Sequence, residues 1–178
     1  DDGDPTLASS VTFYAVPEYG RMLGGYFDGH PWHERVRVKV EDARHPATRH
    51  LGDAFEITDE IYQHKAPYDR ARQHVLLGLD ATSVDLARDG VRRADRDFAL
   101  AWTRAEGRGR VFYTALGHRP EVWADPRFRA HLTGGILWAL RDLVATTEMA
   151  PDDEALRAWE REHPGDPARG QATLRRES

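Results

Sequence analysis

The stretch Arg110-Val111-Phe112-Tyr113-Thr114-Ala115-Leu116-Gly117-His118 decides how the rest of the chain is interpreted. Its β-branched and aromatic residues predict a buried strand over 110–116, and Gly117 lets the chain turn so that His118 follows the carboxyl end of the strand. Ligands of open α/β sheets bind at that end of the strands. We therefore expect the working surface to centre on His118.

The segment before this strand predicts its partner. Residues 98–103 are mostly apolar, and Glu106-Gly107-Arg108-Gly109 places two glycines in a short connection, which is typical of a β-hairpin. Because these glycines join two strands instead of opening a helix, they do not indicate a phosphate-binding loop. Trp102 lies on the first strand of the hairpin. It is interpreted as a core residue, with a stacking wall for a sugar ring as the alternative.

The remaining periodicities complete an α/β domain. Asp125-Pro126 predicts the start of a helix that continues to about Val144, with apolar residues at spacings of three and four. Strict alternation predicts a strand over 36–40, and further strands are expected over 54–62 and 75–77. Short helices are expected over 18–23 and 152–162, and residues 81–97 are interpreted as a long charged excursion.

Composition limits the class of protein. The chain has 178 residues, of which 40% are hydrophobic and 31% charged, as in one globular domain. The formal net charge of −5 and the interleaved arginines and acids predict no nucleic-acid partner. The absence of cysteine excludes disulfides, thiolate metal sites and a cysteine nucleophile in this chain. No run of residues has the length of a membrane span, so a soluble chain is expected, whereas the compartment stays open.

Several polar side chains lie where strands end or loops turn. Proline after a histidine favours extended backbone, and alternation puts the side chains of Glu60 and Tyr62 on one face of their strand. The predicted catalytic residues are His118 and Glu60, and the predicted substrate-binding residues are His30, His45, Tyr62 and Trp102. Turn-capping histidines and a solvated strand-edge carboxylate are the structural alternatives.

The sequence predicts no cofactor and no metal, because it has no strong ligand spacing. A metal site assembled from His30, His45, Glu60 and His118 stays open as a lesser alternative. The other histidines lie in charged or helical contexts and are interpreted as surface residues: His33, His50, His64, His74, His131 and His163.

Short motifs follow one another in a fixed order between about residues 12 and 141. They are residues 19–31, His45-Pro46, Asp59-Glu60-Ile61-Tyr62, Ala101-Trp102, residues 107–118, Asp125-Pro126-Arg127-Phe128 and Gly134-Gly135-Ile136. In this order they resemble the ThuA-like, or trehalose utilisation, family.

This resemblance implies an α/β, flavodoxin-like sheet with flanking helices, of the class I glutamine amidotransferase-like type. The chain is similar to the C-terminal portion of such a domain, which predicts a loop or severed segment over 1–11, the ThuA-like portion over 12–146, and a short helix with a polar tail over 147–178. His118-Arg119-Pro120-Glu121 is similar to the His-Pro-Glu of amidotransferases with one residue inserted. Their nucleophile is a cysteine, so the resemblance does not support glutaminase activity here.

The resemblance implies a role in carbohydrate utilisation, in which the chain acts on or binds trehalose, a related disaccharide or a keto-sugar through histidine and glutamate side chains. The alternative is a non-catalytic sugar-binding or interaction domain with a degenerate amidotransferase-like site. A small carbohydrate and other domains of a longer parent chain are the expected partners.

Overall fold

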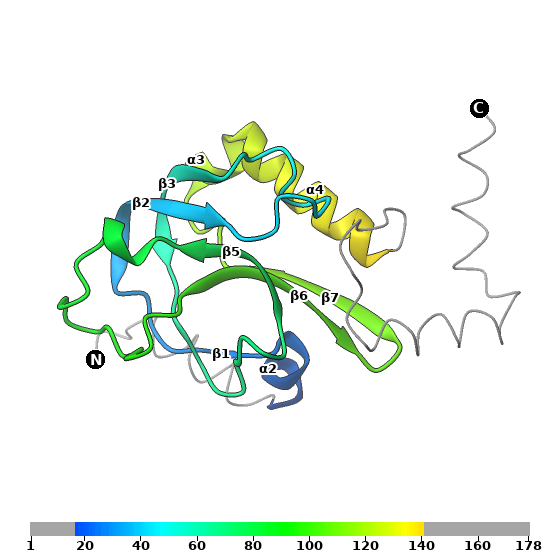
Figure 1. Ribbon diagram of the computed structural model, residues 1–178, viewed down its shortest axis with the longest axis horizontal. Helices are drawn as coiled ribbons and strands as arrows, with labels where there is room; N and C mark the ends of the chain where they lie inside the picture. Colours follow the sequence, from blue (N-terminus) through cyan, green and yellow to red (C-terminus); the bar gives the residue numbers. More distant parts are fainter. Residues whose placement is uncertain (1–16, 141–178) are drawn as a thin grey trace, which may run out of the picture.

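The computed structural model describes residues 17–140, and its main element is a five-stranded sheet with the order β3-β2-β5-β6-β7 (Figure 1). Every neighbouring pair of strands is antiparallel. The strands of this sheet are β2 (Trp32–Val40), β3 (Ala54–Ile61), β5 (His74–Leu79), β6 (Ala99–Glu106) and β7 (Gly109–Thr114). A second, two-stranded sheet pairs β1 (Tyr26–Phe27) with β4 (His64–Lys65).

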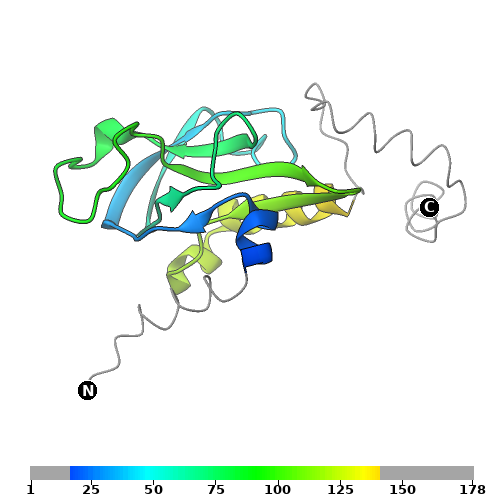
Figure 2. The same cartoon turned by 90° about the horizontal axis from the view of Figure 1, so that it is seen from below.

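Helices flank the sheet, as the sequence predicts. They are α2 (Pro17–Leu23), α3 (Pro120–Ala124) and α4 (Pro126–Ala139), with a 3₁₀ turn η1 (Ala81–Ser83) between β5 and β6. Figure 2 shows α4 lying along one face of the sheet, where it packs against β7. The predicted α/β class is therefore confirmed, and the pairing within the described sheet is antiparallel.

Helix α4 begins where the sequence predicts and ends earlier. The Asp125 carboxylate accepts the Arg127 backbone N–H at 2.8 Å, and Pro126 takes the first helical position. The helix ends at Ala139 instead of continuing to about Val144. Leu140 is 64% exposed, so burial at that position does not favour another turn.

The predicted hairpin is confirmed as β6 and β7. Their ladder runs from the Ala101–Thr114 pair to the Glu106–Gly109 pair, which leaves a two-residue turn. Gly107 in this turn has a φ of +58°, a conformation that glycine adopts without steric cost.

Strand β2 begins four residues before the predicted start at Val36. Trp32 is fully buried, packs edge-on against Phe98 and pairs with Ile61 of β3. The polar residues after Trp32 obscure the start of the strand in the sequence pattern. His33 and Arg35 point to the outer face, while Trp32 and Val36 are buried in the core. The longer strand extends the β2–β3 ladder to the level of Glu60.

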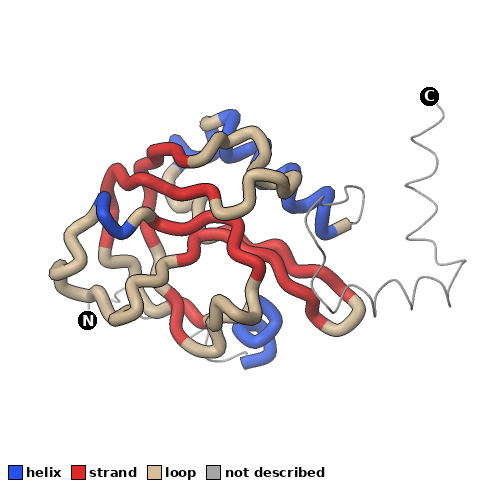
Figure 3. Tube along the Cα trace, viewed as in Figure 1, coloured by secondary structure: helices blue, strands red, loops and turns tan. Residues whose placement is uncertain are grey.

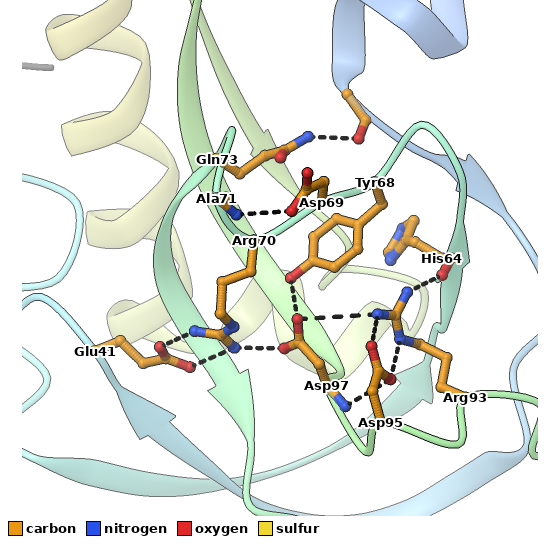
Figure 4. Close-up of polar contacts among 11 residues, drawn as sticks. Glu41, His64, Tyr68, Asp69, Arg70, Ala71, Gln73, Arg93, Asp95 and Asp97 are labelled. Atoms are coloured by element: carbon orange, nitrogen blue, oxygen red, sulfur yellow. Dashed lines mark hydrogen bonds and ion pairs between the residues drawn. The ribbon is translucent and has the colours of Figure 1, made fainter. Parts of the chain in front are cut away.

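The segment between β5 and β6 is mostly loop, as predicted for residues 81–97, and Figure 3 shows it as a long excursion at one end of the sheet. Its last residues are tied down by a network of ion pairs (Figure 4). Asp97 accepts hydrogen bonds from Tyr68 and Arg70, and Arg70 also pairs with Glu41. Arg93 donates to the His64 carbonyl at 2.6 Å.

Four predictions concern residues outside the described range. These are the loop over 1–11, the tail over 147–178, the short helix over 152–162 and the surface position of His163. Within residues 17–140, no helix combines the length and apolar character that crossing a membrane requires.

Candidate functional site

The site is built around the carboxylate of Glu60, near the end of β3. Its side chain is 8% exposed, and three imidazoles contact it. Oε1 lies 3.0 Å from Nε2 of His33 and 3.4 Å from Nδ1 of His30, while Oε2 lies 3.0 Å from Nδ1 of His118. Tyr62 also interacts with Glu60, and the centroid of its ring lies 6.2 Å from that of His30. We call these five residues the Glu60 cluster.

Strand pairing delivers one of the imidazoles. In the β2–β3 ladder His33 stands directly opposite Glu60, so both side chains project from the same face of the sheet. His33 was predicted to be a surface residue. The structure brings it into the cluster while leaving its side chain 50% exposed.

A loop held by Gln63 delivers His30. The Gln63 backbone N–H donates to the Gly29 carbonyl at 2.9 Å, and its side-chain amide donates to the carbonyls of Asp28 and Gly90. Gly29 has a φ of +102°, which the turn before His30-Pro31 requires. The imidazole of His30 then stacks on Phe27, with 5.7 Å between ring centroids.

His118 arrives from the loop after β7, as predicted. Gly117 has a φ of +109°, and a Cβ there would lie 2.9 Å from the Phe128 ring, so only glycine fits. The Trp123 indole N–H donates to the Gly117 carbonyl at 2.8 Å. Sequence patterns did not indicate Trp123, whose side chain lies beside this loop and is 52% exposed.

The sequence profile of the ThuA family, described as trehalose utilisation, matches residues 7–139. The chain belongs to the ThuA family. A ThuA-like protein from Bacteroides uniformis has a similar structure, with 28% identity and a TM-score of 0.58 over 70% of this chain and 51% of that one. A ThuA-like protein from Parabacteroides merdae shares 22% identity, with a TM-score of 0.47 over 72% of this chain and 45% of that one.

This ThuA chain therefore spans about half the length of these two solved relatives. Among curated proteins, no sequence matches it.

Within the ThuA domain, the short distance between His30 and His33 restricts which of their facing nitrogens can carry a proton. Nε2 of His33 lies 2.6 Å from Nδ1 of His30. One of the two nitrogens must carry the proton and the other must accept it, unless both donate lone pairs to a cation. The arrangement can thus share protons among imidazoles and a carboxylate, or bind a metal ion.

The ligand atoms for such an ion come from His30, His33 and Glu60. One atom from each of these three side chains lies within 4.8 Å of the other two. Two imidazoles and one carboxylate are ligands that zinc, manganese and iron accept.

Tyr62 lines the cluster in a neutral state. Burial, together with the nearby Glu60 carboxylate, raises the pKa of the Tyr62 hydroxyl well above its ordinary value. The phenol therefore keeps its proton at neutral pH. Glu60 and Tyr62 share this site, as the alternation in the sequence predicts.

The structure places His45 in a separate buried group. His45 is 1% exposed, accepts the Ala47 backbone N–H at Nδ1, and packs on the Trp138 ring at 5.1 Å. Burial lowers its pKa to about 4, so the imidazole is neutral at neutral pH. These contacts fit the turn-capping alternative better than substrate binding.

Trp102 is fully buried and thus presents no face to a sugar ring. Its indole N–H donates to the Leu23 carbonyl at 2.8 Å, and its ring packs against those of His64 and Tyr113. The core interpretation of Trp102 therefore fits the structure.

Two further histidines differ from the surface prediction. His64 and His131 are 4% and 1% exposed. His64 bonds the Tyr113 hydroxyl, and His131 bonds the Ala47 carbonyl. The surrounding sequence is charged at both positions, but the paired strands and α4 turn these particular side chains inward.

Proposed function

We propose that this ThuA domain acts on a sugar or keto-sugar at the Glu60 cluster, with His118 as general acid and base and Glu60 as its carboxylate partner. The observation that carries the proposal is the convergence of three imidazoles on one nearly buried carboxylate. Membership of the trehalose utilisation family supports a carbohydrate as the substrate class.

The contact between Glu60 and His118 suits proton transfer. Glu60 Oε2 lies 3.0 Å from Nδ1 of His118. A proton on Nδ1 would face this carboxylate, and Nε2 would then be the nitrogen that exchanges a proton with the substrate. A carboxylate that orients an imidazole in this way fixes its tautomer and stabilises the imidazolium that forms. With a keto-sugar, the proton taken would come from a hydroxyl or from the carbon beside the carbonyl. The electron pair of the broken C–H bond would then move towards the carbonyl oxygen.

Turnover tests this role of His118. The purified protein is screened against trehalose, related disaccharides and their keto derivatives, and His118→Asn is expected to lower kcat by about 10²- to 10⁴-fold. His50→Asn is the matched control, because His50 is exposed and its hydrogen bond goes to the Arg127 carbonyl, outside the cluster. Equal turnover by His118→Asn and the native protein would remove His118 from the mechanism.

A metal centre is a second candidate, favoured by the clustering of ligand atoms from His30, His33 and Glu60. A bound divalent ion would act as a Lewis acid on a sugar hydroxyl or carbonyl oxygen. Elemental analysis and zinc titration of chelator-treated protein test it. One equivalent of zinc is expected to bind to the native protein. The zinc affinity of His33→Asn is expected to be about tenfold or more weaker, and that of His74→Asn to be unchanged. Failure of the native protein to bind zinc, manganese or iron would exclude this candidate.

The non-catalytic alternative also makes a distinct prediction. This chain spans about half the length of its solved relatives, and in this alternative the domain binds a sugar whose conversion needs residues outside it. Calorimetric titration separates the two cases. Sugar binding without turnover by the purified protein would favour the binding module.

A further inference from the structure

Asp59, the neighbour of Glu60, faces away from the imidazoles. Consecutive residues of a strand project to opposite sides, so the two carboxylates of Asp59 and Glu60 serve different surroundings. Asp59 is fully buried. A buried carboxylate needs hydrogen-bond donors, and Asp59 finds them in the backbone of the loop that carries His118.

Each oxygen of Asp59 accepts one backbone N–H of that loop. Oδ2 accepts the N–H of Gly117 at 2.7 Å, and Oδ1 accepts the N–H of Arg119 at 3.0 Å. These N–H groups lie on either side of His118 in the sequence. Hydrogen bonds to a charged acceptor are the stronger kind, and two of them on one planar group fix direction as well as distance.

We propose that Asp59 is the positioning residue of the site: its buried carboxylate fixes the backbone on both sides of His118 and so holds the imidazole against Glu60. The functional meaning of this role rests on the function proposed for the Glu60 cluster. Asp59 and Glu60 are adjacent in β3. The end of this strand therefore positions the Glu60 carboxylate and also, through Asp59, the His118 imidazole that contacts it.

The tautomer of His118 is the readout that a purely structural role would not move. In metal-free native protein, the 3.0 Å contact between Nδ1 of His118 and the Glu60 carboxylate predicts the Nδ1–H form, which long-range ¹H–¹⁵N spectra of the imidazoles report. Asp59→Asn keeps one acceptor oxygen but sets an NH₂ group against the other backbone N–H. We expect this variant to shift His118 towards the Nε2–H form and to speed amide exchange at Gly117 or Arg119 by about tenfold.

Asp97→Asn is the matched control. Asp97 is also a largely buried carboxylate, but its donors are Tyr68 and Arg70 in the network of Figure 4. This control is expected to lose stability without any change in the His118 tautomer. A folded Asp59→Asn protein with an unchanged tautomer, or a native protein with His118 in the Nε2–H form, would overturn the proposal.

Hydrogen exchange in the native protein covers the case in which Asp59→Asn does not fold. Slow exchange at both Gly117 and Arg119 supports the two bonds to Asp59, and rapid exchange at both overturns them. This outcome is separable from the proposed function. Full turnover by His118→Asn would contradict the proposed function but not the positioning role of Asp59. An unchanged His118 tautomer in Asp59→Asn would contradict the positioning role but not the proposed function.

Discussion

Gly134 shows how a single residue controls the packing of α4 on the rest of the domain. A Cβ at this position would lie 2.4 Å from the Pro46 carbonyl oxygen and 3.0 Å from Cα of Ala47. Backbone atoms cannot give way as a flexible side chain can. We therefore expect Gly134→Ala to destabilise the fold by about 1–3 kcal/mol, although alanine is the better helix former.

Urea denaturation measures this effect. Thr133→Ala is the control, because Thr133 is the exposed neighbour on the same helix and its replacement is expected to change stability by less than about 0.5 kcal/mol. A Gly134→Ala protein as stable as the native one would show that the helix can move away from the Pro46 backbone.

The residues of the site differ in how far sequence predicts them. Glu60, Tyr62 and His118 follow from alternation and from the glycine after a strand, which are local signals. His33 requires the β2–β3 register, since nothing near it in the sequence marks it as the partner of Glu60. His45 was predicted to bind substrate but lies outside the Glu60 cluster, because a local motif does not determine where its side chain points. Its His-Pro motif predicts extended backbone but not the direction in which the loop turns the imidazole.

At the scale of elements, the network around Asp97 ties the β5–β6 excursion to the segment before β5. Burial alone would raise the pKa of Asp97, but hydrogen bonds from Arg70 and Tyr68 outweigh it and hold the pKa below its ordinary value. The stability that this carboxylate supplies is therefore present above its unfolded pKa and is lost as the pH falls through the folded value.

We expect Asp97→Asn to cost about 1–2 kcal/mol at pH 7, a modest figure because the Arg70 side chain is 45% exposed to solvent. The deficit should shrink as the pH falls below about 4, where Asp97 of the unfolded chain takes up a proton first, and should vanish once the pH passes the lower pKa of Asp97 in the folded protein. Chemical denaturation at several pH values checks this, with exposed Asp69→Asn as the control. A deficit that stays constant with pH would mean that the charge of Asp97 contributes nothing.

Elements with strong local patterns could be predicted, and elements set by tertiary contacts could not. The hairpin of β6 and β7 follows from its glycines, and the start of α4 follows from Asp125-Pro126. The first half of β2 was missed because its polar residues face outward, and its strand character comes from pairing with β3. The end of α4 was placed too late because the apolar spacing in the sequence continues past Ala139, where the helix ends, and Leu140 after it is exposed.

At the scale of the whole molecule, three buried neutral imidazoles make the fold sensitive to acid. Burial lowers the pKa of His45 and His131 to about 4 and that of His64 to about 3. In the unfolded chain these groups take up protons near their ordinary pKa of about 6.5. Protonation therefore favours the unfolded state as the pH falls below that value.

Stability should fall between about pH 6.5 and pH 4, by up to about 1.4 kcal/mol per pH unit for each of these imidazoles. Denaturant unfolding at intervals across this range measures the slope. A His64→Gln variant should show a smaller slope, because it has one fewer histidine to protonate on unfolding. A stability that is flat from pH 7 to pH 5 would show that these imidazoles take up protons without unfolding.

The central claim is that the Glu60 carboxylate organises the working site of this ThuA domain, and Glu60→Gln tests it most directly. The amide keeps the size of the side chain but removes the charge that three imidazoles share. With a sugar or keto-sugar that the native protein turns over, kcat/KM of a folded Glu60→Gln protein is expected to fall by about 100-fold or more. A kcat/KM within about twofold of the native value would contradict the account.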